Sequence, residues 1–368
     1  MMNVVKWQEF LNIISYKKII CFGAGKRFLK LKELPDGNKV IDNIDIIVDN
    51  DISKQGKKVD ILGRAFIVNS WSCLFHKNLD KYVILITIAN GYYTIVEQLK
   101  QLDLYDKVDI YCLTHMLAFI SEQEAMKKEI PENIKFSDKM LIPKTIHYCW
   151  FGKNPIPEKY KKWMESWKQY CPDYEIIEWN EQNYDITKNK YMYNAYKAKK
   201  WGFVPDYARL DIIYNHGGIY LDTDVELIAN IDELLYQKGF AGFESSKYVN
   251  LGLGFGAQRG NRLIKKLMDD YNDREFIIGK EMIASPVIQT EVLRKNGLKL
   301  NGEFQVLEDI VIYPEKMLSG KNLASRRIKL KDYTKSIHHF DGSWLDSEKR
   351  KYAKELEKDI NMDLAFFS

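Results

Sequence analysis

The stretch "GGIYLDTDVE", residues 217–226, decides the fold of the second part of the chain. Two glycines precede a short β-branched and aromatic run, which is typical of a buried strand, and two aspartates follow it one residue apart. In extended chain Asp222 and Asp224 can present oxygens to one point just beyond the strand end. Two carboxylates at one point repel each other unless a cation lies between them, and hard divalent cations bind such oxygens. Because open α/β sheets bind ligands at the carboxyl ends of their strands, we expect a metal site here.

Two simpler interpretations compete with this metal site. A calcium EF-hand would place four of its ligands at Asp222, Asp224, Glu226 and Glu233. Its sixth position requires a glycine for a sharp turn, but Leu227 stands there, and a strand precedes the loop where an EF-hand has a helix. The other interpretation is a solvated turn of acidic residues, which the D-x-D pattern alone does not exclude.

The residues upstream of the acidic pair strengthen the metal interpretation. A helix is predicted over residues 206–215, because Pro205 suits its first turn and Gly217 suits the left-handed position just past its end. Asp206 and Arg209 share one face of this helix at i, i+3 spacing. The helix leads through the double glycine into the strand, so its first turn and the strand end can face one pocket.

The first part of the chain alternates between predicted strands and helices. Strands are predicted in "KKIICFGAG", "IDIIVDND", "AFIVNSW", "YVILITIAN" and "KVDIYCL", and this alternation indicates a parallel sheet covered by helices. We therefore expect an α/β protein with a Rossmann-like domain at 1–120, a polar linker at 121–140 and a second α/β domain at 141–368.

A glycine turn in the first domain is similar to a dinucleotide-binding fingerprint. "CFGAGKRF" follows a strand, and Asp49 comes 26 residues after Gly23, where a ribose-binding acid is expected. The position of the third glycine, which allows close packing of strand and helix, is occupied by Phe28. We expect a Rossmann-like domain that binds no NAD.

The composition excludes several classes of protein. A net charge of +4, from 55 basic and 51 acidic residues, argues against a dedicated nucleic-acid binder. Five scattered cysteines without CxxC spacing are typical of a reduced, cytoplasmic chain without structural zinc. We expect no signal peptide and no membrane span, because the N-terminus lacks a cleavage site and no run of about 18 apolar residues occurs. The 13% aromatic content is common where flat sugars and bases are held.

Three motifs in order, "IPKTIHYCWFG", "DYARLDIIYNHGGIYLDTDVE" and "HHFDGSW", resemble the DXD-containing glycosyltransferases of the capsular-polysaccharide type, glycosyltransferase family 32. They are more distantly similar to the clostridial glucosylating toxins and the glycogenin-like transferases. The resemblance covers roughly residues 141–345. It implies a GT-A fold, a nucleotide-sugar donor, a divalent metal, usually Mn²⁺ with Mg²⁺ tolerated, and retention of the anomeric configuration.

The resemblance also implies a metal site and a catalytic set. Asp222 and Asp224 would bind the metal together with a histidine of the last motif. Adjacent histidines cannot easily bind one ion together, and the spacing favours His339 over His338. The implied catalytic residues are Asp206, Arg209, Asp222 and Asp224.

A larger set of residues would bind the donor. Trp150 would stack on the base, which we expect to be uracil, although a tryptophan in a first strand is also a common core residue. Tyr220 would lie at the nucleoside, and the "GSW" segment would contact the β-phosphate. The implied donor-binding residues are Trp150, Asp206, Arg209, Tyr220, Asp222, Asn250, Gln289, Ser343 and Trp344.

These features favour a metal-dependent retaining transferase that moves a hexose from a UDP-sugar to a polysaccharide or lipid-linked acceptor in bacterial surface glycan synthesis. Such an enzyme would work in the cytoplasm, with peripheral contact at the inner face of the membrane through the Lys- and Tyr-rich "KNKYMYNAYKAKKW". An NAD-dependent sugar-nucleotide oxidoreductase is an alternative, but the first domain lacks a Tyr-x-x-x-Lys motif. A non-catalytic nucleotide-sugar-binding protein is the other, and the intact acidic and histidine ligands argue against it.

Overall fold

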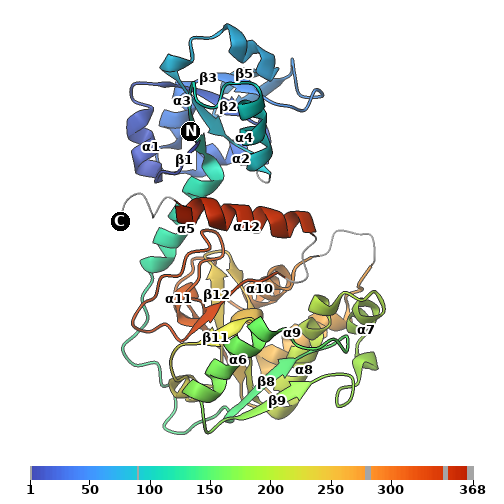
Figure 1. Ribbon diagram of the computed structural model, residues 1–368. Helices are drawn as coiled ribbons and strands as arrows, with labels where there is room; N and C mark the ends of the chain where they lie inside the picture. The colour runs from blue at the N-terminus through green and yellow to red at the C-terminus, as the bar shows by residue number, and fades with distance from the viewer. Residues whose placement is uncertain (1, 89–90, 278–282, 343–346, 363–368) are drawn as a thin grey trace. The chain divides into compact units, whose positions relative to one another are not determined.

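A computed structural model describes residues 2–88, 91–277, 283–342 and 347–362 of the chain (Figure 1). The chain divides into two compact units. The first unit consists of Met1–Glu122, Ala324–Arg326 and Ser347–Ser368, and the second of Gln123–Leu323 and Arg327–Asp346. The sequence analysis placed residues 141–368 in the second domain, whereas Ser347–Ser368 group here with the first unit. The predicted linker also begins as helix, because α5 (Leu113–Met126) runs into it.

The first unit contains a seven-stranded sheet that is parallel except for its β4–β5 hairpin. All five strands predicted from the sequence are present, as β2, β3, β5, β6 and β7. Helices pack on both faces, which explains why the central strand β2 is buried from Ile19 to Phe22 rather than alternating. The elements are β1 (Met2–Asn3), α1 (Trp7–Ile13), β2 (Lys18–Phe22), α2 (Lys26–Leu29), α3 (Gly37–Asn43), β3 (Ile44–Val48), β4 (Lys58–Ile61), β5 (Arg64–Asn69), β6 (Tyr82–Ile86), α4 (Tyr92–Gln101) and β7 (Asp109–Cys112).

The acid of the dinucleotide-like turn makes its hydrogen bonds within the unit. Asp49 Oδ2 accepts from the Ala24 backbone N–H at 2.8 Å and lies 3.0 Å from Lys54 Nζ. Asp49 Oδ1 accepts from the Asp51 N–H at 2.9 Å. Phe28, at the position of the third glycine, is fully buried. The carboxylate therefore fastens the glycine turn to the end of β3.

The second unit is built on a mixed sheet with strand order β15-β16-β12-β14-β10-β8-β9, to which β13 adds at β12. Strand β10 is an inner strand of this sheet, parallel to β8 and antiparallel to β14. A separate antiparallel ribbon is formed by β11 (Val225–Leu227) and β17 (Ser336–His338). The sheet strands are β8 (Thr145–Cys149), β9 (Glu175–Trp179), β10 (Gly218–Tyr220), β12 (Gly239–Ser245), β13 (Tyr248–Val249), β14 (Phe255–Ala257), β15 (Gln305–Val306) and β16 (Val311–Tyr313).

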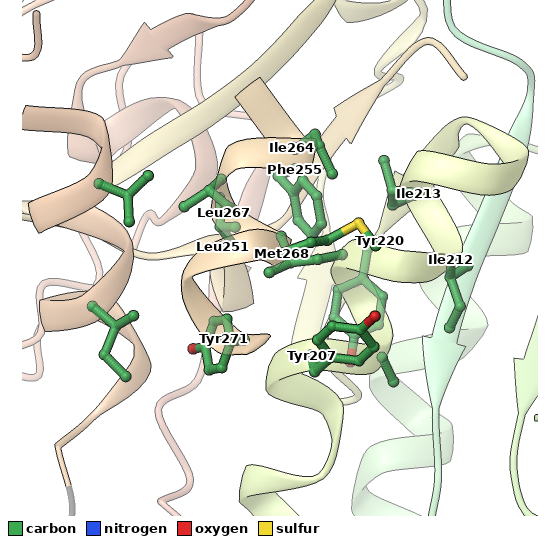
Figure 2. Packing of buried hydrophobic residues seen from close by; sticks show 14 of the residues in the cluster. Tyr207, Ile212, Ile213, Tyr220, Leu251, Phe255, Ile264, Leu267, Met268 and Tyr271 are labelled. Atoms are coloured by element: carbon green, nitrogen blue, oxygen red, sulfur yellow. The ribbon is translucent and has the colours of Figure 1, made fainter. Parts of the chain in front are cut away.

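Helices cover this sheet and create two apolar clusters. One cluster joins α8 and α9 to the sheet, and Figure 2 shows Leu267, Met268 and Tyr271 of α9 near Tyr220 and Phe255. The other lies beneath α6, which packs on β11. The remaining helices are α6 (Glu158–Tyr170), α7 (Lys190–Lys197), α8 (Pro205–His216), α9 (Arg262–Asn272), α10 (Ser285–Lys295) and α11 (Glu315–Leu318) in this unit and α12 (Ser347–Met362) in the first.

The double glycine between α8 and β10 is required by the packing around it. Gly217 and Gly218 have φ of 71° and 98°, which side chains rarely adopt. A Cβ on Gly218 would lie 2.8 Å from Nε2 of His147. That nitrogen donates to the Gly217 carbonyl at 3.0 Å, because Nδ1 of His147 accepts from Trp179 Nε1–H at 3.0 Å. A buried histidine thus fixes the turn that leads into β10.

Candidate active site

The carboxylates of Asp222 and Asp224 meet the imidazole of His338 beyond the end of β10. One ligand atom from each of the three lies within 4.8 Å of the other two. Asp222 and Asp224 lie in the short connection between β10 and β11, and His338 ends β17, so two segments far apart in the sequence supply the cluster. Two carboxylate oxygens and one imidazole nitrogen form a donor set that suits Mn²⁺ and tolerates Mg²⁺. The residues present therefore fit the expected divalent ion.

The histidine in this cluster is His338, whereas spacing in the sequence favoured His339. Nε2 of His338 lies 3.2 Å from Asp224 Oδ1. Nε2 of His339 lies 2.8 Å from Glu226 Oε2, and its ring stacks on Trp163 with centroids 4.0 Å apart and planes 9° apart. Neighbouring side chains at a strand end point to opposite sides. The histidine that lies with the two aspartates is therefore His338 and not the predicted His339.

Buried charges of both signs balance one another in the cluster. Burial raises the pKa of Asp222, and the charge of Asp224 adds to this while Arg209 opposes it. Burial acts in the same direction on Asp224, but His338 outweighs it and lowers the pKa of Asp224 to about 2. Burial acts to lower the pKa of His338, but the carboxylates of Asp224 and Asp222 outweigh it and raise that pKa. The cluster thus combines two carboxylates with a histidine whose protonated form they favour and with the fixed positive charge of Arg209.

The first turn of α8 brings Asp206 and Arg209 to the same place, as the sequence predicts. Arg209 Nη2 lies 2.8 Å from Asp206 Oδ1, and Nη1 lies 3.6 Å from Asp222 Oδ1. The Arg209 Nε–H also donates to the Pro205 carbonyl at 3.0 Å. Burial raises the pKa of Asp206 to about 6, with Arg209 opposing the shift. Arg209 therefore links the helix to the cluster as a fixed, buried positive charge.

Tyr220 and Trp150 occupy different environments. Tyr220 is only 1% exposed, and the Arg209 guanidinium lies over its ring at 5.2 Å from the centroid. It therefore supports Arg209 from the core. Trp150 is half-buried at the end of β8, its Nε1–H donates to the Asn154 carbonyl at 2.6 Å, and its ring meets Tyr160 edge to face. The indole ring is held in a fixed orientation.

Asn250 and Gln289 hold one loop. Asn250 Nδ2 donates to Glu244 Oε2 at 2.9 Å, and its Oδ1 accepts from the Gly252 N–H at 2.7 Å. Gln289 is fully buried, and its Oε1 accepts from the Leu251 N–H at 3.1 Å. Both predicted donor-binding side chains thus shape the backbone at 250–252.

Gly252 belongs to the site, although the sequence analysis did not single it out. A Cβ at this position would lie 2.4 Å from Asp222 Oδ2 and 3.4 Å from Arg209 Nη1. The glycine-rich "NLGLGFGA" was the available signal, but nothing local indicates which of its glycines meets a residue thirty positions upstream. Its backbone forms a wall against the metal-ligand cluster.

The two remaining donor-binding predictions, Ser343 and Trp344, lie outside the residues that the structure describes.

The Lys- and Tyr-rich stretch forms α7 and the turn after it. Tyr191, Met192 and Ala195 are buried beneath it, whereas Tyr193 is 38% exposed. Its outer lysines are also exposed, namely Lys197, Lys199 and Lys200. No helix in the described part of the chain is long and apolar enough to cross a bilayer.

The chain is similar in part to known glycosyltransferases. Residues 157–241 match the family model described as a glycosyltransferase sugar-binding region containing a DXD motif. The chain is 35% identical over 106 residues to inositol phosphoceramide mannosyltransferase 3 of Schizosaccharomyces pombe, covering 26% of this chain and 28% of that protein. It is 21% identical over 140 residues to the initiation-specific alpha-1,6-mannosyltransferase of Candida albicans, covering 33% and 36%.

A bacterial protein and a solved structure are also similar. The subversion of eukaryotic traffic protein A of Legionella pneumophila is 26% identical over 159 residues, covering 35% of this chain and 24% of that protein. The PaToxG glycosyltransferase structure superposes with a TM-score of 0.35 at 17% identity, over 49% of this chain and 80% of that one. The chain spans about a quarter to a third of the length of the three curated relatives.

Proposed function

Because the chain contains the glycosyltransferase sugar-binding region with its DXD motif, we propose that it is a metal-dependent retaining hexosyltransferase. The donor is a nucleotide sugar, with UDP as the nucleotide, and the second unit has the GT-A fold. The observation that carries this proposal is the meeting of Asp222, Asp224 and His338 beside the Asp206–Arg209 pair. A solvated acidic turn would not have a carboxylate 3.6 Å from an arginine whose side chain is only 4% exposed.

The chain's own residues have separate roles in this proposal. Asp222, Asp224 and His338 would hold a divalent cation, Mn²⁺ or Mg²⁺, which when bound neutralises charge that develops on the leaving diphosphate. Arg209 adds a fixed positive charge in a site shielded from water, where such charges act strongly. Asp206, oriented by Arg209, accepts a hydrogen bond from a hydroxyl of the transferred sugar.

Retention follows from front-face attack by the acceptor. Asp206 is 3% exposed, and its two oxygens face Arg209 and Tyr191 at 2.8 and 3.5 Å. A carboxylate held in this way suits binding of a hydroxyl better than attack on the anomeric carbon. The leaving phosphate then serves as the base for the incoming hydroxyl.

The acceptor is a glycan or a lipid-linked saccharide of a bacterial surface polysaccharide, handled at the cytoplasmic face of the membrane. The name of the Schizosaccharomyces pombe relative includes inositol phosphoceramide, a lipid, which supports a lipid-linked acceptor. The exposed Lys197, Lys199 and Lys200 beside Tyr193 supply a surface for peripheral contact with anionic lipid.

A donor screen tests this function. Release of the nucleoside diphosphate is measured with each common nucleotide sugar in Mn²⁺, in chelator, and after Mn²⁺ is restored. We expect release with a UDP-sugar that disappears in chelator and returns with the metal. Full activity in chelator would contradict the metal site, and release from a GDP-sugar alone would contradict the nucleotide.

A substitution at the cluster makes the same test specific. Asp224→Asn removes charge from the ligand set and should lower turnover by about 10²-fold or more. Asp173→Asn is the matched control, because Asp173 is exposed and pairs only with Lys144 in the described structure. Equal losses in both variants would show that the effect is not specific to the site.

A further inference from the structure

We propose that helix α6 is the platform that positions the metal ligands Asp224 and His338. This inference rests on the proposed function, because it takes the cluster to be a divalent-cation site. Both ligands adjoin the β11–β17 ribbon, which pairs only three residues of each strand. An isolated two-stranded ribbon is marginally stable at best, so its geometry has to be imposed by what it packs on.

The C-terminal half of α6 holds β11. Trp167, which is fully buried, donates its Nε1–H to the Val225 carbonyl at 2.9 Å. Ser166 Oγ accepts from the Leu227 N–H at 2.8 Å. Val225 directly follows the ligand Asp224, so these two bonds fix the backbone on which that carboxylate stands.

The N-terminal half of α6 holds the chain that leaves β17. The His339 ring lies flat on Trp163, and its Nε2–H donates to Glu226 of β11. Asp341 accepts hydrogen bonds from Tyr160 and Lys159, which lie one turn earlier on the helix. Residues 339–341 are thereby fastened to the same helix as β11.

The fastened segment in turn orients both ligands. The His339 N–H donates to the Asp224 carbonyl at 2.9 Å, and the Asp341 N–H donates to Asp224 Oδ2 at 3.0 Å. Oδ1 of the same carboxylate faces His338 Nε2. A shift of residues 339–341 therefore rotates the Asp224 carboxylate and moves His338 together. Trp163, Tyr160 and His339 are positioning residues that do not themselves touch the ion.

Metal affinity is the readout that separates positioning from general stability. Partners that orient metal ligands typically contribute 10- to 100-fold to metal affinity. We expect Trp163→Ala to weaken Mn²⁺ binding about 10-fold or more, and Trp163→Phe, which keeps a ring under His339, to recover most of it. Tyr160→Phe removes the hydroxyl that donates a hydrogen bond to Asp341, and should weaken Mn²⁺ binding about threefold. Lys162→Ala is the matched control, on the exposed face of the same helix.

The experiment titrates Mn²⁺ into each full-length variant and follows free Mn²⁺ by electron paramagnetic resonance, with the melting temperature recorded in parallel. Wild-type affinity in a folded Trp163→Ala protein overturns the positioning role. If Trp163→Ala does not fold, an unchanged affinity in Tyr160→Phe overturns it instead. If the wild-type protein does not bind Mn²⁺, the proposed metal site itself is wrong. This outcome is distinguishable from failure of the positioning role, because it is seen in the wild-type protein alone.

Discussion

At the residue scale, the pKa values of two aspartates in one motif are shifted in opposite directions. The pKa of Asp224 is lowered to about 2, with His338 at one oxygen and a backbone N–H at the other. The pKa of Asp222 is raised, since burial and Asp224 outweigh Arg209. Both acids and the Asp206–Arg209 pair could be proposed from the sequence, because the spacing of nearby residues on one helix or one strand determines which side chains share a face. The sequence could not identify Gly252, because its approach to Asp222 depends on the tertiary path of the loop at 250–252.

Replacing Gly252 by alanine should disturb the site without disturbing the fold. Its φ does not require glycine, so the new methyl group acts through its overlap with the Asp222 carboxylate. We expect Asp222 to rotate and kcat/KM to fall about tenfold or more, measured as donor hydrolysis. Gly25→Ala is the control, because a Cβ there meets nothing within 4 Å. Unchanged activity in Gly252→Ala would remove the loop from the site.

Trp150 gives a second prediction at this scale. If its ring stacks on the base, Trp150→Ala should weaken UDP binding by roughly 1–3 kcal/mol, and Trp150→Phe should restore much of the loss. The fixed Nε1–H bond to Asn154 means that the ring is already oriented before the ligand arrives. UDP affinity is measured by calorimetry. An intact fold with wild-type affinity in the alanine variant would identify Trp150 as a core residue.

At the scale of elements, the helix predicted over 206–215 is found as Pro205–His216, and the strand before the acidic pair is found as β10. These boundaries could be predicted because Pro205 begins the helix and Gly217 ends it. The aromatic side chains of α6 contact both the sheet and the ribbon region: Trp167 packs on Tyr148 of β8 and donates to the Val225 carbonyl of β11, and Trp163 stacks on His339, which follows β17. Spacing favoured His339 over His338, but the residue at which β17 ends, and so the histidine that lies with the two aspartates, is set by pairing with β11.

The turn between α8 and β10 should make stability depend on pH. Burial lowers the pKa of His147 to about 4, against about 6.5 in an unfolded chain. Below pH 6.5 the unfolded state therefore binds more protons than the folded state, and stability is lost as pH falls from about 6.5 to 4. The full shift corresponds to on the order of 3 kcal/mol. His115 in the first unit, with its pKa also lowered to about 4 by burial, contributes in the same direction.

Denaturant unfolding at several pH values measures this effect. His147→Gln should be less stable than wild type at pH 7 but lose less stability on acidification, because the proton-linked part is gone. His76→Gln, at an exposed position, should keep the wild-type slope. A wild-type slope in His147→Gln would mean that other groups cause the acid sensitivity.

At the scale of the whole molecule, the parallel sheet of the first unit could be predicted from alternating elements, but its boundaries could not. Ala324–Arg326 and helix α12 group with residues 1–122, and no local pattern links segments so far apart. Leu356 of α12 is buried in the same apolar cluster as Phe22 of β2. The polar composition of 121–140 suggested a linker, whereas the helix that enters it is defined by tertiary packing.

The first unit should depend on Asp49 for stability and should not respond to NAD. Asp49→Ala leaves the N–H groups of Ala24 and Asp51 without their acceptor, and should lower stability by about 1–3 kcal/mol. Asp106→Ala, at an exposed position, serves as control. Addition of NAD to the wild-type protein should leave the melting temperature unchanged. A clear rise would favour the oxidoreductase alternative.

The discontinuous make-up of the first unit has a consequence during synthesis. Domains generally fold from the N-terminus as they leave the ribosome, but here α12 follows the entire second unit in the chain. Until α12 has been synthesised, Leu356 and Tyr352 cannot cover the apolar cluster of the first unit. Tyr92, which Tyr352 contacts, is among the residues that stay exposed until then. A nascent or prematurely terminated chain therefore exposes an apolar surface of the kind that chaperones and proteases recognise. A chain that includes α12 buries this surface.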